Sequence, residues 1–228
     1  MPVEIGLLLF PGLTQLDLTG PYEVFTRITG ARVHLLWKTL GPITADSGLT
    51  LLPTTTLAES PRLDVLCVPG GPGTTPLLED AEVLSFLTHQ AERARFVTSV
   101  CTGSLVLAAA GLLDGYRAAC HWTSREFLAQ LGAEVSTARV VVDRNRITGG
   151  GVTAGIDFAL TLAAALVDEH EARRIQLQIE YNPSPPYDAG SPESAGPALV
   201  AEVLDRASAT LASRRAIVGQ VARPARDR

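Results

Sequence analysis

The stretch ARFVTSVCTGSLVLAAAGLL, residues 94–113, joins a β-rich run to a helical run, and a cysteine stands at the junction. The residues before Cys101 favour a buried strand, whereas the leucines and alanines after it favour a helix. Small or polar residues surround the cysteine, namely Thr98, Ser99, Thr102, Gly103 and Ser104. A strand that turns directly into a helix is the repeating unit of a parallel α/β sheet. We therefore expect Cys101 at the carboxyl end of a parallel strand.

The same alternation of strand and helix runs from Val3 to about Val167. The patterns predict strands over residues 3–10, 32–40, 63–68, 95–100 and 117–122, and a strand pair around residues 143–146. They predict helices over residues 20–28, 79–94, 102–113 and 124–133. Residues 149–167 repeat the order of strand, turn and helix. We expect a doubly wound, mainly parallel sheet with helices on both faces. Turn residues between 41 and 57 predict a hairpin outside the main sheet.

The length of 228 residues, 46% of them hydrophobic, suits one α/β domain over residues 1–228. The composition changes after Glu171. A predicted helix over residues 172–181 is followed by a proline-rich loop over 182–197 and a last helix over 198–219, with a frayed end beyond it. We treat residues 171–228 as a C-terminal helical and proline-rich extension of the domain.

Charge and cysteine content exclude several classes of partner. The net charge is −5, and the one basic cluster (Arg223, Arg226 and Arg228) is too small for a nucleic-acid footprint. No apolar run reaches the roughly 18 residues that a membrane span needs. The three cysteines cannot all pair internally, and the N-terminus lacks the features of a signal peptide. We therefore expect a cytoplasmic protein that binds neither nucleic acid nor membrane.

Three predicted strand ends carry glycine-containing turns, at residues 69–71, 101–103 and 149–151. The carboxyl ends of parallel strands lie side by side, so these turns are expected to line one pocket. A helix start offers unpaired N–H groups and the positive end of the helix dipole, which lower a thiol pKa. This predicts a nucleophile at Cys101. The alternative, a small residue that fills space under a helix, stays open on the pattern alone.

Few other side chains are candidates for a proton partner. Asp17 follows the first strand on the expected pocket side, where it is either a functional carboxylate or a helix cap. His121 follows a predicted strand end and could approach the pocket, whereas His34 lies in an apolar strand, and His89 and His170 lie in polar helices. Cys67 lies within an apolar strand and is interpreted as a core residue. The residues around Cys120 do not distinguish a core role from a functional one.

Four motifs occur in order: LDLTGPYEVF (16–25), CVPGG (67–71), SVCTGS (99–104) and GGGVTAGID (149–157). Together they resemble the DJ-1/PfpI superfamily over about the first 170 residues. Within it, the sequence is most similar to isonitrile (isocyanide) hydratases through Asp17, Thr102 and the stretch IEYNPSPPYDAGSP. The resemblance implies a flavodoxin-like fold, a homodimer, no cofactor and no metal. It also implies hydration of isonitriles to N-substituted formamides.

The resemblance assigns roles to six residues. Cys101 matches the nucleophile, which forms a thioimidate, and Asp17 matches the general acid and base. Thr102 is a polar neighbour, and the backbone N–H groups of Gly71 and Thr102 would form an anion hole. The Val152 amide would donate to the sulfur, and Gly150 would line the pocket.

Other members of the superfamily provide the alternatives. PfpI-type proteases have a histidine directly after the cysteine, where this chain has Thr102, and glyoxalases of the superfamily rely on a glutamate where this chain has Asp17. AraC-type regulators share these motifs and add a helix-turn-helix domain, for which no stretch here is a candidate. The alternatives are another cysteine enzyme or redox sensor, glyoxalase-like, and a non-catalytic ligand-binding module. A sensor or binding module would tolerate loss of Asp17, whereas a catalyst would not.

Overall fold

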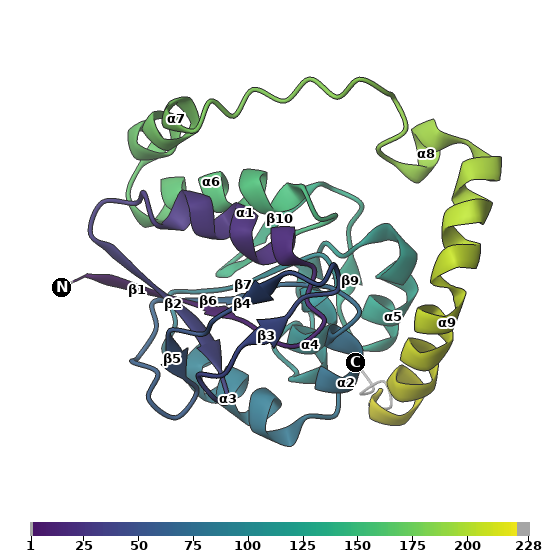
Figure 1. The fold of residues 1–228 in the computed structure, drawn as a ribbon, viewed down its shortest axis with the longest axis horizontal. Helices are drawn as coiled ribbons and strands as arrows, with labels where there is room; N and C mark the ends of the chain where they lie inside the picture. Colours follow the sequence, from purple (N-terminus) through teal and green to yellow (C-terminus); the bar gives the residue numbers. More distant parts are fainter. Residues whose placement is uncertain (1, 223–228) are drawn as a thin grey trace.

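Seven strands form the central sheet of the computed structural model, which describes residues 2–222 (Figure 1). Their spatial order is β10 (Val140–Asp143), β11 (Arg146–Gly149), β7 (Phe96–Val100), β6 (Val65–Val68), β1 (Val3–Leu8), β2 (Ala31–Trp37) and β5 (Thr55–Thr56). All neighbours pair in parallel except β10 and β11, which form the predicted antiparallel pair. The mainly parallel sheet is confirmed.

Helices cover both faces of this sheet (Figure 1). One face carries α1 (Gln15–Phe25), α6 (Ala154–Leu166) and α7 (Glu169–Gln178); the other carries α2 (Thr74–Leu77), α3 (Ala81–Ala91), α4 (Gly103–Ala109) and α5 (Arg125–Gln130). A short parallel pair, β8 (Arg117–Ala118) and β9 (Glu134–Val135), and a 3-10 turn over Trp122–Ser124 flank α5. This layering confirms the doubly wound architecture.

The segment between residues 41 and 57 differs in part from the prediction. Strands β3 (Ile43–Thr44) and β4 (Thr50–Leu51) form the expected antiparallel hairpin outside the main sheet. The residues of β5, however, extend the main sheet by pairing in parallel with Leu36 and Trp37 of β2. The β-branched side chains of Thr55 and Thr56 suit such an edge position.

Helix α1 begins at Gln15 rather than at Gly20, so Pro21 does not lie in the first turn, where the predicted helix over residues 20–28 would have placed it. Pro21 lies inside the helix, where its missing N–H leaves one intrahelical hydrogen bond unmade. The helix packs closely on α6 at this point: a Cβ added to Gly155 would lie only 3.1 Å from Pro21 Cδ. The earlier start places Asp17 in the first helical turn instead of in the preceding loop.

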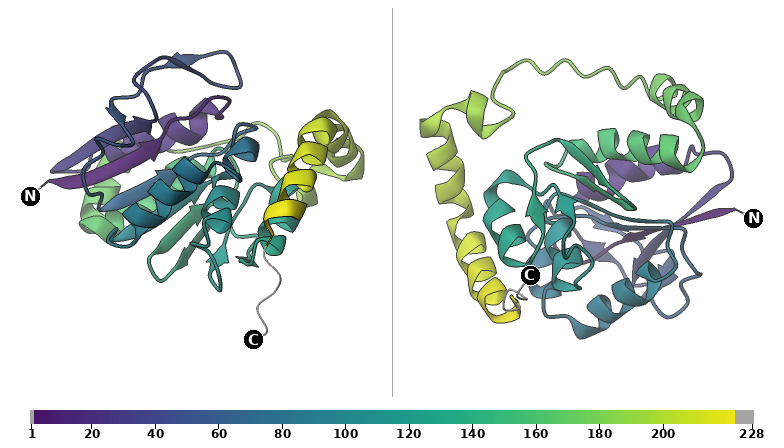
Figure 2. Two further views of the ribbon diagram at one scale, coloured as in Figure 1. Left: turned by 90° about the horizontal axis from the view of Figure 1, so that it is seen from below. Right: turned by 180° about the vertical axis from the view of Figure 1, so that it is seen from behind.

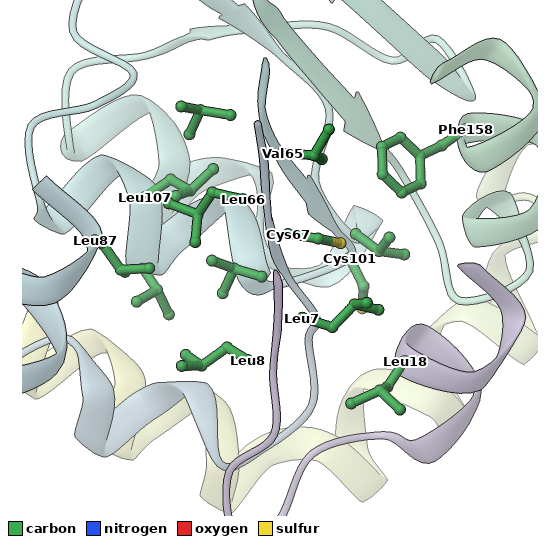
Figure 3. Packing of buried hydrophobic residues seen from close by; sticks show 14 of the residues in the cluster. Leu7, Leu8, Leu18, Val65, Leu66, Cys67, Leu87, Cys101, Leu107 and Phe158 are labelled. Carbon is green, nitrogen blue, oxygen red and sulfur yellow. The ribbon is translucent and has the colours of Figure 1, made fainter. Parts of the chain in front are cut away.

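The core surrounds the central strands, as Figure 3 shows. All four residues of β6 are buried, as expected for a parallel strand covered on both faces. Leu66 points toward Leu87 and Leu107, whereas Cys67 points to the side of Phe158 (Figure 3). Cys67 is 0% exposed, and burial raises the pKa of its thiol to about 12. Its interpretation as a core residue is confirmed.

The chain after α7 crosses in an extended segment to α8 (Pro192–Ala195) and then forms α9 (Pro197–Val221), beside α2 and α5 (Figure 2). Most of α9 is exposed, and its buried residues are Arg214 and Val218. The predicted frayed end falls largely on residues 223–228, which lie outside the described part of the chain together with the basic cluster. No helix among residues 2–222 is long and apolar enough to cross a membrane.

The start of α4 depends on a glycine. A Cβ at Gly103 would lie 2.0 Å from the Val68 carbonyl oxygen and 2.7 Å from that of Pro69. We expect Gly103→Ala to lower the free energy of unfolding by about 3 kcal/mol or more, because the backbone at Val68 and Pro69 would have to move to make room for the methyl group. Urea unfolding measures this, with Gly219→Ala as the control, since nothing lies within 4 Å of a Cβ there. Equal stability of Gly103→Ala and wild type would contradict the close approach.

Candidate active site

Cys101 occupies a strained turn between β7 and α4. Its φ is 57°, in the left-handed region that residues with a Cβ rarely adopt. Its N–H donates to the Gly149 carbonyl at 3.0 Å, which ties the second glycine turn to the third. The residue is 5% exposed, so the sulfur lies just below the surface. The predicted position at the carboxyl end of a parallel strand is confirmed.

Asp17 reaches the same place from the first turn of α1 and is 0% exposed. Its Oδ2 accepts a hydrogen bond from the Gly70 N–H at 3.0 Å, and the Cys101 thiol lies close enough to the same carboxyl group to act on its pKa. Its Oδ1 meets no N–H or O–H donor of the described residues. The structure therefore brings together the thiol and carboxyl groups that the sequence proposed as partners.

Burial raises the pKa of both acids of this pair. It raises the pKa of Asp17 from its ordinary value to about 7, while the bonds from Cys101 and Gly70 oppose the rise. Burial, and then the neighbouring Asp17 charge, raise the pKa of the Cys101 thiol well above its ordinary value. The Thr102 N–H favours the thiolate, as expected at a helix start, but burial outweighs it. The predicted lowering of this pKa is therefore wrong: once Asp17 has ionised, above about pH 7, the proton that the pair retains rests on sulfur.

Gly70 is a site residue that the sequence analysis missed. A Cβ there would lie 2.6 Å from Asp17 Oδ2, 2.6 Å from the Thr102 nitrogen and 2.8 Å from Cys101 Cβ. Only a glycine leaves room for these three groups to converge. The motif CVPGG offered the signal, since it places two glycines directly after a buried strand.

Thr102 and Gly71 hold each other in the structure. The Gly71 N–H donates to Thr102 Oγ1 at 2.9 Å, so it is already paired, unlike the free anion-hole donor that we expected. Thr74 Oγ1 donates to the Gly71 carbonyl at 2.7 Å and lies 3.2 Å from Thr102 Oγ1. This leaves the backbone N–H of Thr102 as the donor that acts on the Cys101 sulfur.

The third glycine turn, between β11 and α6, contains Gly150 and Val152. Gly150 is buried, and its N–H donates to the Arg139 carbonyl at 2.9 Å. Val152 is half-buried and packs against the core. Its donation to the sulfur stays a prediction, as does the pocket-lining role of Gly150.

Cys120 and His121 lie near the pair without joining it. Cys120 is 1% exposed, and burial raises the pKa of its thiol to about 12. His121 Nδ1 lies 2.8 Å from Thr123 Oγ1, and burial lowers its pKa, so the ring is neutral at pH 7. Among residues 2–222, no three His, Cys, Asp or Glu side chains are grouped as metal ligands.

A buried cation also lies close to this site. Arg214, from α9, is 3% exposed, and its Nη1 donates to Ser124 Oγ at 2.7 Å. Sequence reasoning missed it, because nothing in the sequence of this helix distinguishes one arginine from its neighbours. The contact joins residues far apart in the chain.

Comparisons with known proteins agree with this geometry. The model of the DJ-1/PfpI family matches residues 3–165, and the chain belongs to this family. An isonitrile hydratase from Pseudomonas putida is 54% identical over 222 residues, which are 97% of each chain. A crystal structure of a ThiJ/PfpI family protein from Pseudomonas syringae has a TM-score of 0.93 and 44% identity, over 96% of this chain and 91% of that one.

A more distant relative matches this chain over less than half of its own length. The transcriptional regulator GbdR of Pseudomonas aeruginosa is 34% identical over 170 residues, which cover 71% of this chain and 46% of the regulator. The match to the hydratase is nearly full-length, so it includes the C-terminal extension.

The raised pKa of Asp17 predicts how its replacement affects stability. The unfolded carboxyl ionises near pH 3.9, whereas the folded one stays protonated to about pH 7. Wild type therefore loses stability as pH rises through this window, and asparagine cannot ionise. We expect the free energy of unfolding of Asp17→Asn to be about 2 to 4 kcal/mol higher than that of wild type at pH 8.5, and nearly equal to it at pH 4.

Urea unfolding at both pH values measures this effect. The exposed Asp188→Asn serves as the control, for which we expect no pH-dependent difference. A gain for Asp17→Asn that is the same at both pH values would contradict the raised pKa.

Proposed function

We propose that this protein hydrates isonitriles to N-substituted formamides, with Cys101 as nucleophile and Asp17 as general acid and base. The observation that carries the proposal is the buried pair of Cys101 and Asp17, whose thiol and carboxyl groups act on each other's pKa. The nearly full-length likeness to an isonitrile hydratase supports this substrate over others that a thiol enzyme accepts.

In the first half of the reaction, Asp17 takes the Cys101 proton as sulfur attacks the terminal carbon of R–NC. A carboxylate with a pKa of about 7 suits this task near neutral pH. One carbon–sulfur bond forms, and Asp17 then gives its proton to the same carbon. The product is a thioimidate, R–N=CH–S–Cys101, and Asp17 is ionised again.

In the second half, water adds to the thioimidate carbon. Asp17 takes one proton from the water and passes it to the substrate nitrogen, which gives a tetrahedral adduct. The carbon–sulfur bond then breaks as the hydroxyl proton passes through Asp17 to sulfur. R–NH–CHO leaves, the thiol is restored, and the net change is addition of one water. A single carboxyl group serves every proton transfer.

The site also suits the shape of the substrate. Cys101 is only 5% exposed, and glycines occur in all three turns around it. A linear N–C group is narrow enough to reach a sulfur at that depth, while the group R stays farther out. We therefore expect tolerance of both aliphatic and aromatic R groups.

Turnover of cyclohexyl isonitrile tests the proposal. Wild type should give N-cyclohexylformamide by chromatography and mass spectrometry, Cys101→Ala should give none, and Asp17→Asn should lose a factor of about 10²–10⁴. The kcat/KM should fall as pH drops through about 7, because Asp17 must be ionised to accept the thiol proton.

Methylglyoxal is the comparison substrate. Equal rates for wild type and Cys101→Ala, with methylglyoxal consumed by wild type, would replace this proposal by a glyoxalase-like one. A full-rate Asp17→Asn would remove Asp17 from the mechanism.

The proposed working form is a cytoplasmic homodimer. Its three cysteines are free thiols, as a reducing compartment requires. The extension exposes large apolar side chains, with Leu177 and Tyr187 each 81% exposed. Such exposure on a surface favours burial against a second copy.

Light scattering at micromolar concentration tests the dimer. We expect a mass twice the 24.1 kDa of the chain. A stable species at the mass of one chain would contradict the dimer and leave the chemistry unaffected.

A further inference from the structure

The guanidinium group of Arg214 is a buried cation without a carboxylate partner among the described residues. Nη1 donates to Ser124 Oγ at 2.7 Å, and Nη2 lies 3.4 Å from Thr74 Oγ1. Nε is buried and has no partner in the described part of the chain. Burying a charge on neutral hydroxyls alone is costly. This cost makes a purely structural role a poor explanation.

Two buried thiols lie near enough to the guanidinium to act on its pKa, Cys120 more strongly than Cys101. Burial lowers the pKa of Arg214, while Cys120 and Cys101 oppose that effect. The other titratable groups near this region are Arg125 and His121, and neither supplies a negative charge at neutral pH. Asp17 approaches Cys101 from the side of α1. The anion that Arg214 is placed to stabilise is therefore a sulfur.

A chain of hydroxyl groups also connects Arg214 to the turn that holds the nucleophile. Thr74 Oγ1, next to Nη2, lies 3.2 Å from Thr102 Oγ1. Thr102 directly follows Cys101, and its side chain accepts the Gly71 N–H at 2.9 Å. Movement of α9 would thus change the surroundings of the Thr102 N–H, which acts on the sulfur.

We infer that Arg214 is a positioning residue for Cys101: its charge favours the sulfur anion as the proton leaves, and its contact through Thr74 holds Thr102 in place. This inference rests on the proposed role of Cys101 as nucleophile. It makes α9 a part of the active site, although Arg214 lies outside the 3–165 region that defines the family.

Alkylation of Cys101 by iodoacetamide tests the inference without any isonitrile. Rates between pH 7 and 10, read by peptide mapping, compare wild type with Arg214→Met, which removes the charge and keeps an apolar stem. We expect the thiol pKa to rise by about one unit, so that the alkylation rate at pH 8 falls roughly tenfold. Arg214→Lys, which keeps the charge, should restore most of the rate.

Arg215→Met is the matched control, because Arg215 is the next residue of α9 and pairs with exposed Glu126. We expect its alkylation profile to equal that of wild type. A folded Arg214→Met with a wild-type profile, or a loss of equal size in Arg215→Met, would overturn the inference.

Thr74→Val keeps the inference testable if Arg214→Met does not fold. It retains the charge and the side-chain volume but breaks the hydroxyl chain. We expect alkylation at pH 8 to slow several-fold with little change in Tm, and an unchanged rate would overturn the positioning role. If wild type alkylates as expected but forms no formamide, the proposed function fails while the role of Arg214 stands.

Discussion

The bare Cα of Gly70 is what allows the Asp17 carboxyl group and the Cys101 turn to share one buried volume. Any side chain there would meet Asp17 Oδ2, the Thr102 nitrogen and Cys101 Cβ within 3 Å. The Gly70 N–H also supplies a hydrogen bond to the carboxylate. The end of β6 thus fixes the distance between the thiol that follows β7 and the carboxyl group on α1. The sheet order, with β6 between β1 and β7, makes this meeting geometrically necessary.

The same closeness determines the chemistry. Excluding water raises the pKa of both acids, so the pair keeps both protons below about pH 7 and one proton above it. Reactivity then does not depend on a thiolate at rest. It depends on a carboxylate that can accept the thiol proton at the moment of attack. The strained φ of Cys101 keeps its sulfur at this carboxylate rather than packed under α4.

Local patterns predicted much of this arrangement. The succession of strands and helices, the three glycine turns and the pairing of Cys101 with Asp17 followed from periodicity, glycine placement and family motifs. The start of α1 did not, because proline most often marks a first turn, whereas here close packing on α6 accommodates Pro21 mid-helix. The direction of the Cys101 pKa also failed, since burial depends on segments far away in sequence. Arg214 was missed for the same reason, as it meets Thr74 across 140 residues.

The charges of the buried groups bear on how Cys101 reacts. When Asp17 is ionised and Cys101 is a thiol, the pair carries one negative charge, and Arg214 brings one positive charge into the same region of the interior. Proton transfer from sulfur to Asp17 moves the negative charge toward the side of Arg214 without changing this sum. A cation on a helix outside the family core thus makes it easier for a deeply buried thiol to act as a nucleophile.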